Sequence, residues 1–330
     1  MENTESLKMT EITQTIPETP EQIPITQNPI KEDIRQSDNW AECLKLYNWK
    51  AIKTSNGNNI YILKTPIGGF VKIQRPKLLD EAELDEIEKI CKENNALFIK
   101  LDPNIGQDLH LLEKKGYRLS KELLCPSLTI YIDLEKTETE LWNGLSHSAK
   151  YSVNRAKREG AYTELIQNPN EEQLEKFYKV YLETAKYRKL SIKNIADLKK
   201  RVEVFKNESY IVFVYDKDKN LVGCKFYIGH KGNLWYIYGG TTSKGRVKSK
   251  AGYLLMWNSL LYFKEKGYKF LDLEGISDPR LPKSIVNWGG FSHFKERFNG
   301  VHIEFPWPQI KYFSPLLKII DKIYGRYVSI

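Results

Sequence analysis

The pattern of apolar and polar positions changes near residue 39, and from there it alternates between helical and strand spacing. Residues 80–96 place apolar side chains three and four positions apart, which predicts an amphipathic helix. The apolar run at 96–101 then predicts a strand that ends at Asp102-Pro103. A second helix over 108–115 is expected to end at Gly116, because glycine commonly closes a helix.

The rest of the chain continues this mixture. Thr137 and Glu140 have the spacing of a capping box, which predicts the start of a helix. Further helices are predicted at about 171–188, 193–206 and 252–266, and strands at 127–134, 210–215, 221–229, 234–238 and 269–273. This order predicts an α/β (α+β) protein with mixed, mostly antiparallel sheets flanked by helices.

Two predicted helix-to-strand junctions share the same chemistry. Both Lys115-Gly116-Tyr117 and Lys266-Gly267-Tyr268 end a helix and lead into the next strand. Two related halves would explain the repeat, and so would chance, since glycine is common at helix ends.

The first 38 residues differ from the rest in composition and charge. They contain no aromatic residue and no glycine but four prolines, so we expect residues 1–38 to form a disordered acidic tail. The tail carries three basic and eight acidic residues, a net charge of −5, and the remainder carries 48 basic and 34 acidic residues, a net charge of +14. This excess either reflects surface composition alone or favours anionic partners such as phosphate-bearing substrates, RNA or acidic membrane.

Cysteine, histidine and hydropathy patterns exclude several classes of protein. The cysteines (Cys43, Cys91, Cys125 and Cys224) are too widely spaced for a metal clip and lie among apolar residues, as expected of buried free thiols in a reducing compartment. The five histidines show no ligand spacing, so we expect no metal. No stretch approaches the length of a membrane span, and the N-terminus has no basic start followed by an apolar core, so a soluble cytoplasmic protein is expected.

Three segments carry candidate chemistry. Lys150 and Arg155 belong to a basic helix within 141–160, which is either a solvated face or a contact for phosphates or an RNA end. The basic loop 241–252 opens a helix but has too few glycines to predict a coenzyme A site. In 284–300, Lys295 is surrounded by Phe291, Phe294 and Phe298, so it either lies over an aromatic cluster or offers its charge to a developing oxyanion.

Together these motifs give the chain a resemblance to the FemABX peptidyltransferases. The resemblance rests on several short motifs in order: Trp40 with Lys45, Leu101-Asp102-Pro103, the basic run 155–160, the strand end 235–240, Leu271–Ile276 and Gly289–Phe298. It covers most of residues 39–304, and the motif at 289–298 is its most specific part. The family has two fused N-acetyltransferase-like domains, and some members carry a coiled-coil arm. The sequence shows no heptad run of that length, so we expect the armless type.

The resemblance implies roles for individual residues. Phe294 and Lys295 fall on a Phe-Lys pair at the acyl-transfer centre, and Asp102 falls on an aspartate near the attacking amine. Tyr238 matches a tyrosine in the substrate channel. An alternative for Asp102 is ordinary turn chemistry, and for Tyr238 a half-buried strand position.

The positions that bind the diphosphate of the precursor in the family match less closely. Lys45 lies one position beyond the expected lysine, and the expected arginine falls at Lys193 or Asn194, with Arg188 nearby as a substitute. Lysine offers a point charge where arginine offers a two-pronged donor, so these departures leave the substrate open.

The activity implied by the resemblance is transfer of an amino acid from aminoacyl-tRNA to the stem peptide of a peptidoglycan precursor, by a monomer that uses no cofactor. Residues 39–135 with 305–330 would form the first domain, and residues 136–304 the second. An acyl-CoA-dependent N-acyltransferase of sugar precursors and a non-catalytic RNA- or membrane-binding protein are the alternatives. The apolar face of 313–324 predicts a helix that closes the first domain, or one that touches the cytoplasmic membrane face.

Overall fold

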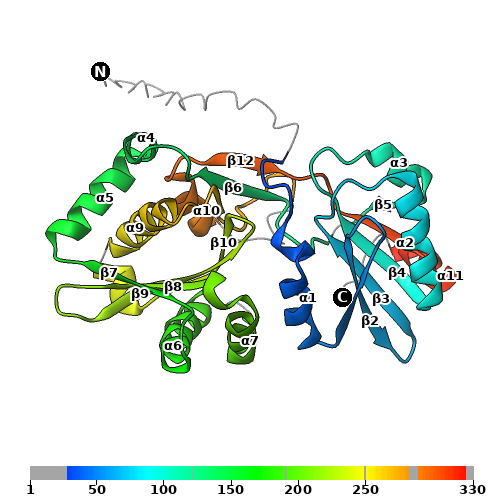
Figure 1. The fold of residues 1–330 in the computed structure, drawn as a ribbon, viewed down its shortest axis with the longest axis horizontal. Coiled ribbons are helices and arrows are strands. Elements are labelled where there is room, and N and C mark those ends of the chain that lie inside the picture. Colours follow the sequence, from blue (N-terminus) through cyan, green and yellow to red (C-terminus); the bar gives the residue numbers. More distant parts are fainter. Residues whose placement is uncertain (1–27, 121, 190–191, 249, 282–288, 325–330) are drawn as a thin grey trace, which may run out of the picture.

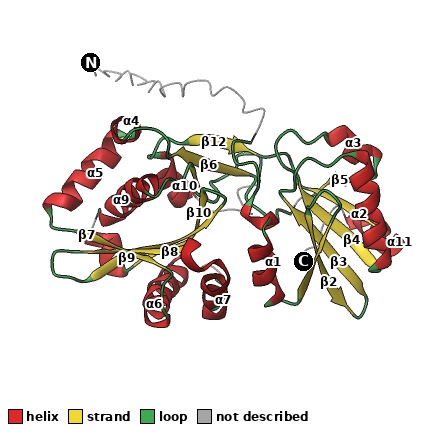
Figure 2. Cartoon of the chain, viewed as in Figure 1, coloured by secondary structure: helices red, strands yellow, loops and turns green. Residues whose placement is uncertain are grey.

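The chain folds into two mixed sheets, each flanked by helices, in a computed structural model that describes residues 28–120, 122–189, 192–248, 250–281 and 289–324 (Figures 1 and 2). The predicted α/β class is therefore confirmed. Parallel pairing occurs between β3 and β4 and between β10 and β11, and the other strand pairs of the two sheets are antiparallel.

The first sheet has the order β1-β2-β3-β4-β13-β5. Its strands are β1 (Trp49–Lys53), β2 (Asn59–Thr65), β3 (Gly68–Gln74), β4 (Ala96–Asp102), β5 (Arg118–Leu119) and β13 (Gln309–Tyr312). Helices α2 (Glu81–Glu93) and α3 (Leu109–Lys114) pack their apolar residues on this sheet, with Leu84, Ile87 and Leu112 in its core. Strand β13 comes from near the C-terminus and lies inside the sheet, so the chain returns to its first half at the end.

The second sheet has the order β12-β6-β11-β10-β9-β8-β7. Its strands are β6 (Leu128–Asp133), β7 (Tyr162–Gln167), β8 (Ser209–Tyr215), β9 (Leu221–His230), β10 (Asn233–Thr241), β11 (Phe270–Asp272) and β12 (Val301–Glu304). Strand β6, which the sequence-based boundary at 135 grouped with the first half, pairs with β11 and β12 of this sheet.

Helices cover both faces of the second sheet (Figure 1). One face carries α4 (Glu138–Gly144), α5 (His147–Arg158) and α9 (Ala251–Glu265), and the other carries α6 (Glu171–Arg188) and α7 (Ile195–Phe205). The predicted capping box is present at the start of α4, where Thr137 and Glu140 satisfy each other's backbone N–H groups. Helices α8 (Ser243–Lys248) and α10 (Gly289–Glu296) lie near the end of β10. No described helix exceeds the 18 residues of α6, and none is long and apolar enough to cross a membrane.

The sequence-based expectation of a tail reaching residue 38 is wrong for residues 28–38; residues 1–27 lie outside the described part of the chain. Ile30 and Ile34 are fully buried in a core that contains residues of both halves. A short 3-10 helix (Ile34–Gln36) leads into α1 (Asp38–Lys45), which packs against both β1 and α7. This N-terminal segment therefore lies at the junction of the two halves, which we call the seam.

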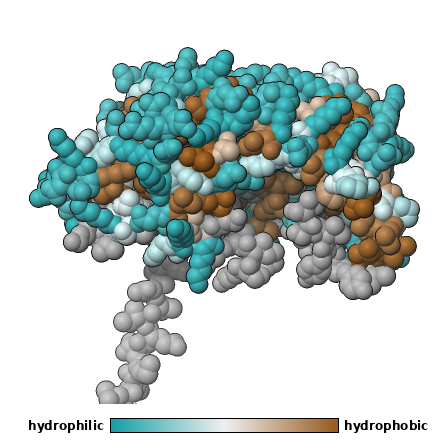
Figure 3. Space-filling model, turned by 90° about the horizontal axis from the view of Figure 1, so that it is seen from below, coloured by the Kyte–Doolittle hydropathy of each residue, from teal (hydrophilic) through white to brown (hydrophobic). Residues whose placement is uncertain are grey.

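The C-terminal helix α11 (Pro315–Tyr324) packs beside the first sheet. Asp321 accepts a hydrogen bond from the Tyr312 hydroxyl and pairs with Arg118, and Leu317 packs against Phe98 and its neighbours. Leu316 and Ile319 remain exposed on its other side. Seen from below, the molecule has a mostly hydrophilic surface, with hydrophobic surface at the end where α11 lies (Figure 3).

Candidate active site

The second sheet opens where β10 and β11 separate. These strands pair only over Asn233–Trp235 and Phe270–Asp272, whereas β10 runs on to Thr241 with a bulge between Tyr236 and Tyr238. A pocket of about 440 Å³ lies at this end of β10, lined by β9, β10, the end of α6 and the starts of α9 and α10. We call it the strand-end pocket. Separated strands leave a cavity because no ladder partner fills the space beside β10.

Lys295 places a buried ammonium beside this pocket. Its side chain comes from α10 and is 7% exposed, and its Nζ donates to the backbone carbonyls of Glu274 at 3.1 Å and Gly275 at 2.5 Å. Burial lowers the pKa of Lys295 to about 8, against the opposing effect of the carboxylates of Glu274 and Asp272. Two of its three N–H donors have acceptors among the described residues, which leaves one for a ligand.

The two carbonyls that hold Lys295 belong to an unusual turn after β11. Glu274 has φ +56° and Gly275 has φ +85°, so a glutamate occupies the left-handed region that favours glycine. The turn is fixed by Asp272 and Thr129: Asp272 accepts from the Glu274 N–H at 2.7 Å and from the Thr129 hydroxyl at 2.6 Å, and Thr129 accepts from the Gly275 N–H at 3.0 Å. The turn does not itself line the strand-end pocket and is joined to it through Lys295.

Aromatic rings form the wall and the mouth of the strand-end pocket. Phe294 lines it and packs on Tyr253, with ring centroids 4.9 Å apart. At the mouth, the guanidinium of Arg188 lies 4.6 Å from the ring centroid of Phe291. The structure thus brings together three predicted positions, Lys295, Phe294 and Arg188, although Arg188 was expected to bind the diphosphate of a precursor.

Sequence reasoning missed two residues of this pocket, Lys225 and Tyr236. Lys225 on β9 is 6% exposed, and its Nζ lies 3.7 Å from the ring centroid of Tyr236. Burial lowers the pKa of Lys225 well below its usual value, and the charge of Lys295 lowers it further. The sequence did contain a signal for Lys225, because a lysine stands there inside an otherwise apolar strand.

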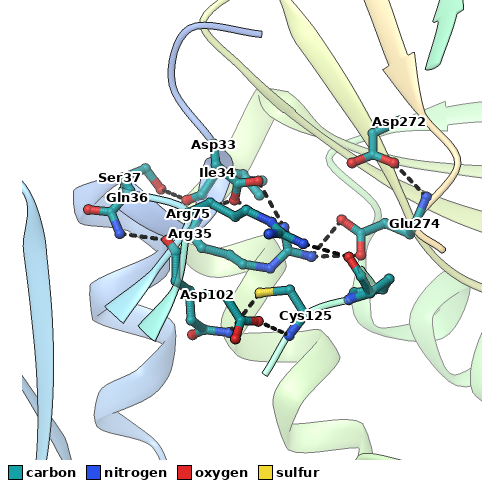
Figure 4. A network of polar contacts seen from close by, with 12 residues as sticks. Asp33, Ile34, Arg35, Gln36, Ser37, Arg75, Asp102, Cys125, Asp272 and Glu274 are labelled. Carbon is teal, nitrogen blue, oxygen red and sulfur yellow. Dashed lines mark hydrogen bonds and ion pairs between the residues drawn. The ribbon is translucent and has the colours of Figure 1, made fainter. Parts of the chain in front are cut away.

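The seam connects the strand-end pocket to the N-terminal segment. Arg35 is 6% exposed and donates to both carboxylate oxygens of Glu274 and to Asp33 (Figure 4). Arg75 extends across the same region, donates to the carbonyls of Pro103 and Pro126, and lies over the ring of Phe305. The side chain of Glu274 therefore binds the first half while its carbonyl binds Lys295.

Asp102 lies in the seam and does not line the strand-end pocket. One of its carboxylate oxygens accepts the backbone N–H groups of Leu124 at 3.1 Å and Cys125 at 2.6 Å, and the other is buried without a partner among the described residues. Burial raises the pKa of Asp102. Its observed contacts hold the 124–125 backbone.

Tyr238 and Lys193 meet at a cluster between the two halves, which we call the Asp197 cluster. The hydroxyls of Tyr238 and Tyr47 each donate to Asp197 at 3.0 Å, and Arg201 donates to it at 2.7 Å. The Nζ of Lys193 lies 4.5 Å from the ring centroid of Tyr47. One carboxylate therefore joins the turn between α1 and β1, which carries Tyr47, to α7 and β10 of the second half.

Lys72, another residue that the sequence did not single out, approaches this cluster from β3. Its Nζ lies 4.3 Å from the ring centroid of Trp49. Burial lowers the pKa of Lys72 to about 8, and the nearby charge of Lys193 adds to this effect. Lys72 and Lys193 therefore supply two neighbouring positive charges at the junction of the halves.

The remaining predicted residues lie outside the strand-end pocket and the Asp197 cluster. Lys45 is exposed and pairs with Glu42 one turn away, and it faces an open groove that is also lined by Trp49, the ring over which Lys72 lies. On α5, Lys150 donates to the Asn143 carbonyl and Arg155 pairs with Glu159. None of the three lines the strand-end pocket.

Cysteines and metal ligands add no further site. The four cysteines are free and buried, and burial raises the pKa of each thiol, which makes them poor nucleophiles. Within the described ranges, no three His, Cys, Asp or Glu side chains are grouped as metal ligands.

Comparisons with known proteins agree with the resemblance seen in the motifs. The sequence model described as the FemAB family matches residues 116–221. A lipid II:glycine glycyltransferase of Staphylococcus aureus (strain MRSA252) is 27% identical over 169 residues, which cover 42% of this chain and 40% of that protein. A second such protein, from Staphylococcus aureus (strain USA300), is 27% identical over 161 residues. The chain thus matches about two fifths of the length of these curated relatives.

Solved structures extend the match in fold. A crystal structure of FemX superposes with a TM-score of 0.74 and 16% identity, covering 88% of this chain and 95% of that one. The C-terminal domain of a putative lysylphosphatidylglycerol synthetase from Agrobacterium fabrum has a TM-score of 0.61 with 13% identity, covering 90% and 96%. The resemblance to the FemABX family is therefore confirmed in sequence over residues 116–221 and in fold over most of the chain.

Proposed function

We propose that this relative of the FemAB family is an aminoacyltransferase that moves an amino acid from aminoacyl-tRNA to an amine on the stem peptide of a peptidoglycan precursor. The observation that carries the proposal is the buried ammonium of Lys295, held by two carbonyls beside the strand-end pocket, with a third N–H that has no acceptor in the described part of the chain. The glycyltransferase relatives and the shared fold of FemX support the same reaction class.

The reaction is aminolysis of an ester. The acceptor amine attacks the aminoacyl carbonyl, the carbonyl oxygen becomes an oxyanion, and the bond to the ribose oxygen then breaks. The free N–H of Lys295 is placed to stabilise that oxyanion, and a buried, fixed donor is far more effective than one in water. The ester is already activated, so the reaction proposed here requires no cofactor or metal ion and depends mainly on alignment of the two substrates.

The binding site of the acceptor, the peptidoglycan precursor, is assigned to the junction of the halves beside the Asp197 cluster. Lys72 and Lys193 there supply two positive charges for the phosphates of a nucleotide-linked or lipid-linked precursor, and the rings of Trp49 and Tyr47 offer flat surfaces for its sugars. The aminoacyl end of the tRNA is assigned to the strand-end pocket, with Arg188 at its mouth. The transfer then takes place near Lys295, where the turn at Glu274 joins the seam to the pocket.

Membrane contact is assigned to α11. Leu316 and Ile319 are 65% and 56% exposed, and Lys318 and Lys322 are exposed on the same helix. An apolar face bordered by lysines favours the surface of an anionic bilayer. The protein would then act as a monomer at the cytoplasmic membrane face, close to a lipid-linked acceptor.

The experiment that tests the function is mass spectrometry of acceptors after incubation. Nucleotide-linked and lipid-linked muramyl pentapeptides are each mixed with the protein and a charged tRNA pool. A gain of one amino-acid mass is the expected result, absent with uncharged tRNA and formed about 10²- to 10³-fold more slowly with Lys295→Ala. A gain of an acyl mass with acetyl-CoA instead of tRNA would assign the protein to the acyl-CoA-dependent enzymes, and no gain with either donor would overturn the proposal.

A further inference from the structure

Lys225 is a buried amine that faces the strand-end pocket without a hydrogen-bond acceptor. It is 6% exposed and lines the pocket, and none of the described residues accepts a hydrogen bond from its Nζ. The Nζ lies instead over two rings, 3.7 Å from the centroid of Tyr236 and 4.9 Å from that of Phe294. A lysine buried without a partner costs stability, so its presence calls for a role in the pocket.

Lys225, which lines the pocket, and Lys295, which lies beside it, have opposite surroundings. Both amines approach the ring of Tyr236, at 3.7 Å for Lys225 and 5.7 Å for Lys295. Lys295 has two carbonyls and the nearby carboxylates of Glu274 and Asp272, all of which favour its charged form. Lys225 has neither a carbonyl nor a carboxylate partner in the described part of the chain, and it has the positive charge of Lys295 as a neighbour.

The other titratable groups near Lys225 do not change this contrast. Tyr236 on β10 and Cys224 on β9 are buried, and burial raises both pKa values, so both are neutral at pH 7. Arg188 lines the same pocket from α6 and is a further positive charge. Two neighbouring amines in these settings separate into one charged and one neutral group, a division that assigns acid and base roles in enzyme sites.

We infer that Lys225 is the catalytic residue that exchanges protons with the attacking amine and the leaving ribose oxygen, while Lys295 stabilises the oxyanion. The inference rests on the proposed function, because it assigns the second role within the same pocket. The geometry supports the inference because both amines approach the Tyr236 ring, and among the described residues Lys295 has hydrogen-bond acceptors whereas Lys225 has none.

The proton balance of the step is complete with these groups. The acceptor enters as a neutral amine, having given its extra proton to solvent, and its nitrogen forms a bond to the ester carbonyl carbon. The nitrogen then carries a positive charge and passes one proton to the neutral Nζ of Lys225. When the C–O bond breaks, Lys225 returns that proton to the ribose oxygen and is neutral again.

The test compares Lys225→Met with Lys225→Arg in the transfer assay. Methionine keeps the length and apolar character of the side chain without an amine, and arginine keeps a positive charge that does not dissociate. We expect both variants to lose about 10²- to 10⁴-fold in turnover, the usual contribution of a proton-transfer residue. In both variants the slope of log kcat against pH on the acidic side should fall by about one, because one titrating group has been removed. Lys217→Met, on the exposed turn between β8 and β9, is the matched control and should match the wild type.

Activity in Lys225→Arg would overturn the inference, because it would make Lys225 a fixed positive charge. Near-normal turnover in Lys225→Met would overturn it as well. A second measurement is independent of transfer: acetic anhydride labelling followed by peptide mapping. A neutral amine should be labelled at pH 7 ahead of the exposed Lys217, and labelling that requires a pH above about 10, near the ordinary lysine value, would contradict the inference. Wild-type protein that transfers nothing would count against the proposed function instead.

Discussion

Arg35 and Glu274, 239 positions apart in the chain, form a buried ion pair in which one guanidinium nitrogen donates to both carboxylate oxygens, at 2.7 and 2.6 Å. The backbone carbonyl of the same Glu274 accepts from Lys295. The N-terminal segment therefore helps to hold the turn on which the proposed oxyanion donor depends.

Replacing Arg35 with alanine should destabilise the protein and slow transfer. Loss of the guanidinium leaves the buried carboxylates of Asp33 and Glu274 without their partner, which costs about 3 to 5 kcal/mol. Urea unfolding measures the stability change, and turnover at a temperature where the variant is folded measures the effect on Lys295. The exposed Lys45→Ala is the control, with a change within about 0.5 kcal/mol. Equal stability of the two variants would contradict the role of the pair.

Lys295→Ala should reduce turnover about 10²- to 10³-fold with little change in the KM of the acceptor, because its charge is used in the transition state. Steady-state kinetics with a purified charged tRNA measures both constants. Lys295→Arg separates charge from position, since a guanidinium does not fit the two carbonyls of Glu274 and Gly275 in the same way. Near wild-type turnover in the alanine variant would remove Lys295 from the site.

The pKa of about 8 for Lys295 predicts a descending limb in the activity profile. In the proposed mechanism Lys295 acts as an ammonium, so kcat should fall as the pH rises through about 8. The effect on stability has the opposite sign. Between pH 8 and the pKa of lysine in the unfolded chain, the unfolded chain binds more protons than the folded one. This group therefore raises the free energy of unfolding as the pH rises. Turnover and urea unfolding over pH 6.5 to 10 test both signs, with Lys295→Met expected to lack both effects.

Lys72→Met and Lys193→Met should weaken acceptor binding without changing turnover. Each removes a positive charge at the junction of the halves, so the KM of a diphosphate-bearing acceptor should rise several-fold and its salt dependence should become shallower. The measurement is acceptor KM at low and high salt. Lys186→Met on the exposed side of α6 is the control, and a fall in kcat at constant KM would place these lysines elsewhere in the mechanism.

The exposed face of α11 predicts binding to anionic vesicles. The double variant Leu316→Ser/Ile319→Ser should bind such vesicles several-fold more weakly, because both apolar side chains are lost from the helix surface. Cosedimentation with vesicles that contain phosphatidylglycerol measures the difference. Equal binding of wild type and variant would exclude α11 as the contact face.

The helices and strands with regular spacing could be predicted from the sequence. The prediction of 171–188 coincides with α6, and those of 210–215 and 221–229 agree with β8 and β9 within a residue. Gly116 and Gly267 both have φ near +80°, so the repeated Lys-Gly-Tyr junctions close their helices in the same way. Strands β1 and β2 were not recognised, although Asn56-Gly57 between them is a strong hairpin signal.

Other features depend on contacts that composition does not reveal. Residues 28–38 have the composition of a disordered tail but are ordered by partners far along the chain, including Glu274 for Arg35 and His230 and Lys231 for Glu32. Lys225 was missed because the strand was treated as uniformly apolar. Its neighbours on both faces of β9 are buried. A lysine is rare in such a strand, so its presence there indicates a functional site.

The position of β13 has a consequence for how the protein matures on the ribosome. This strand, at residues 309–312, lies between β4 and β5, and Arg35 can form its ion pair only after Glu274 has been synthesised. The first half is therefore synthesised first but completed last. The chain therefore cannot fold one domain at a time from the N-terminus. A nascent chain that has already formed the strand-end pocket would have an unfinished first half, and transfer activity should arise only when synthesis is nearly complete.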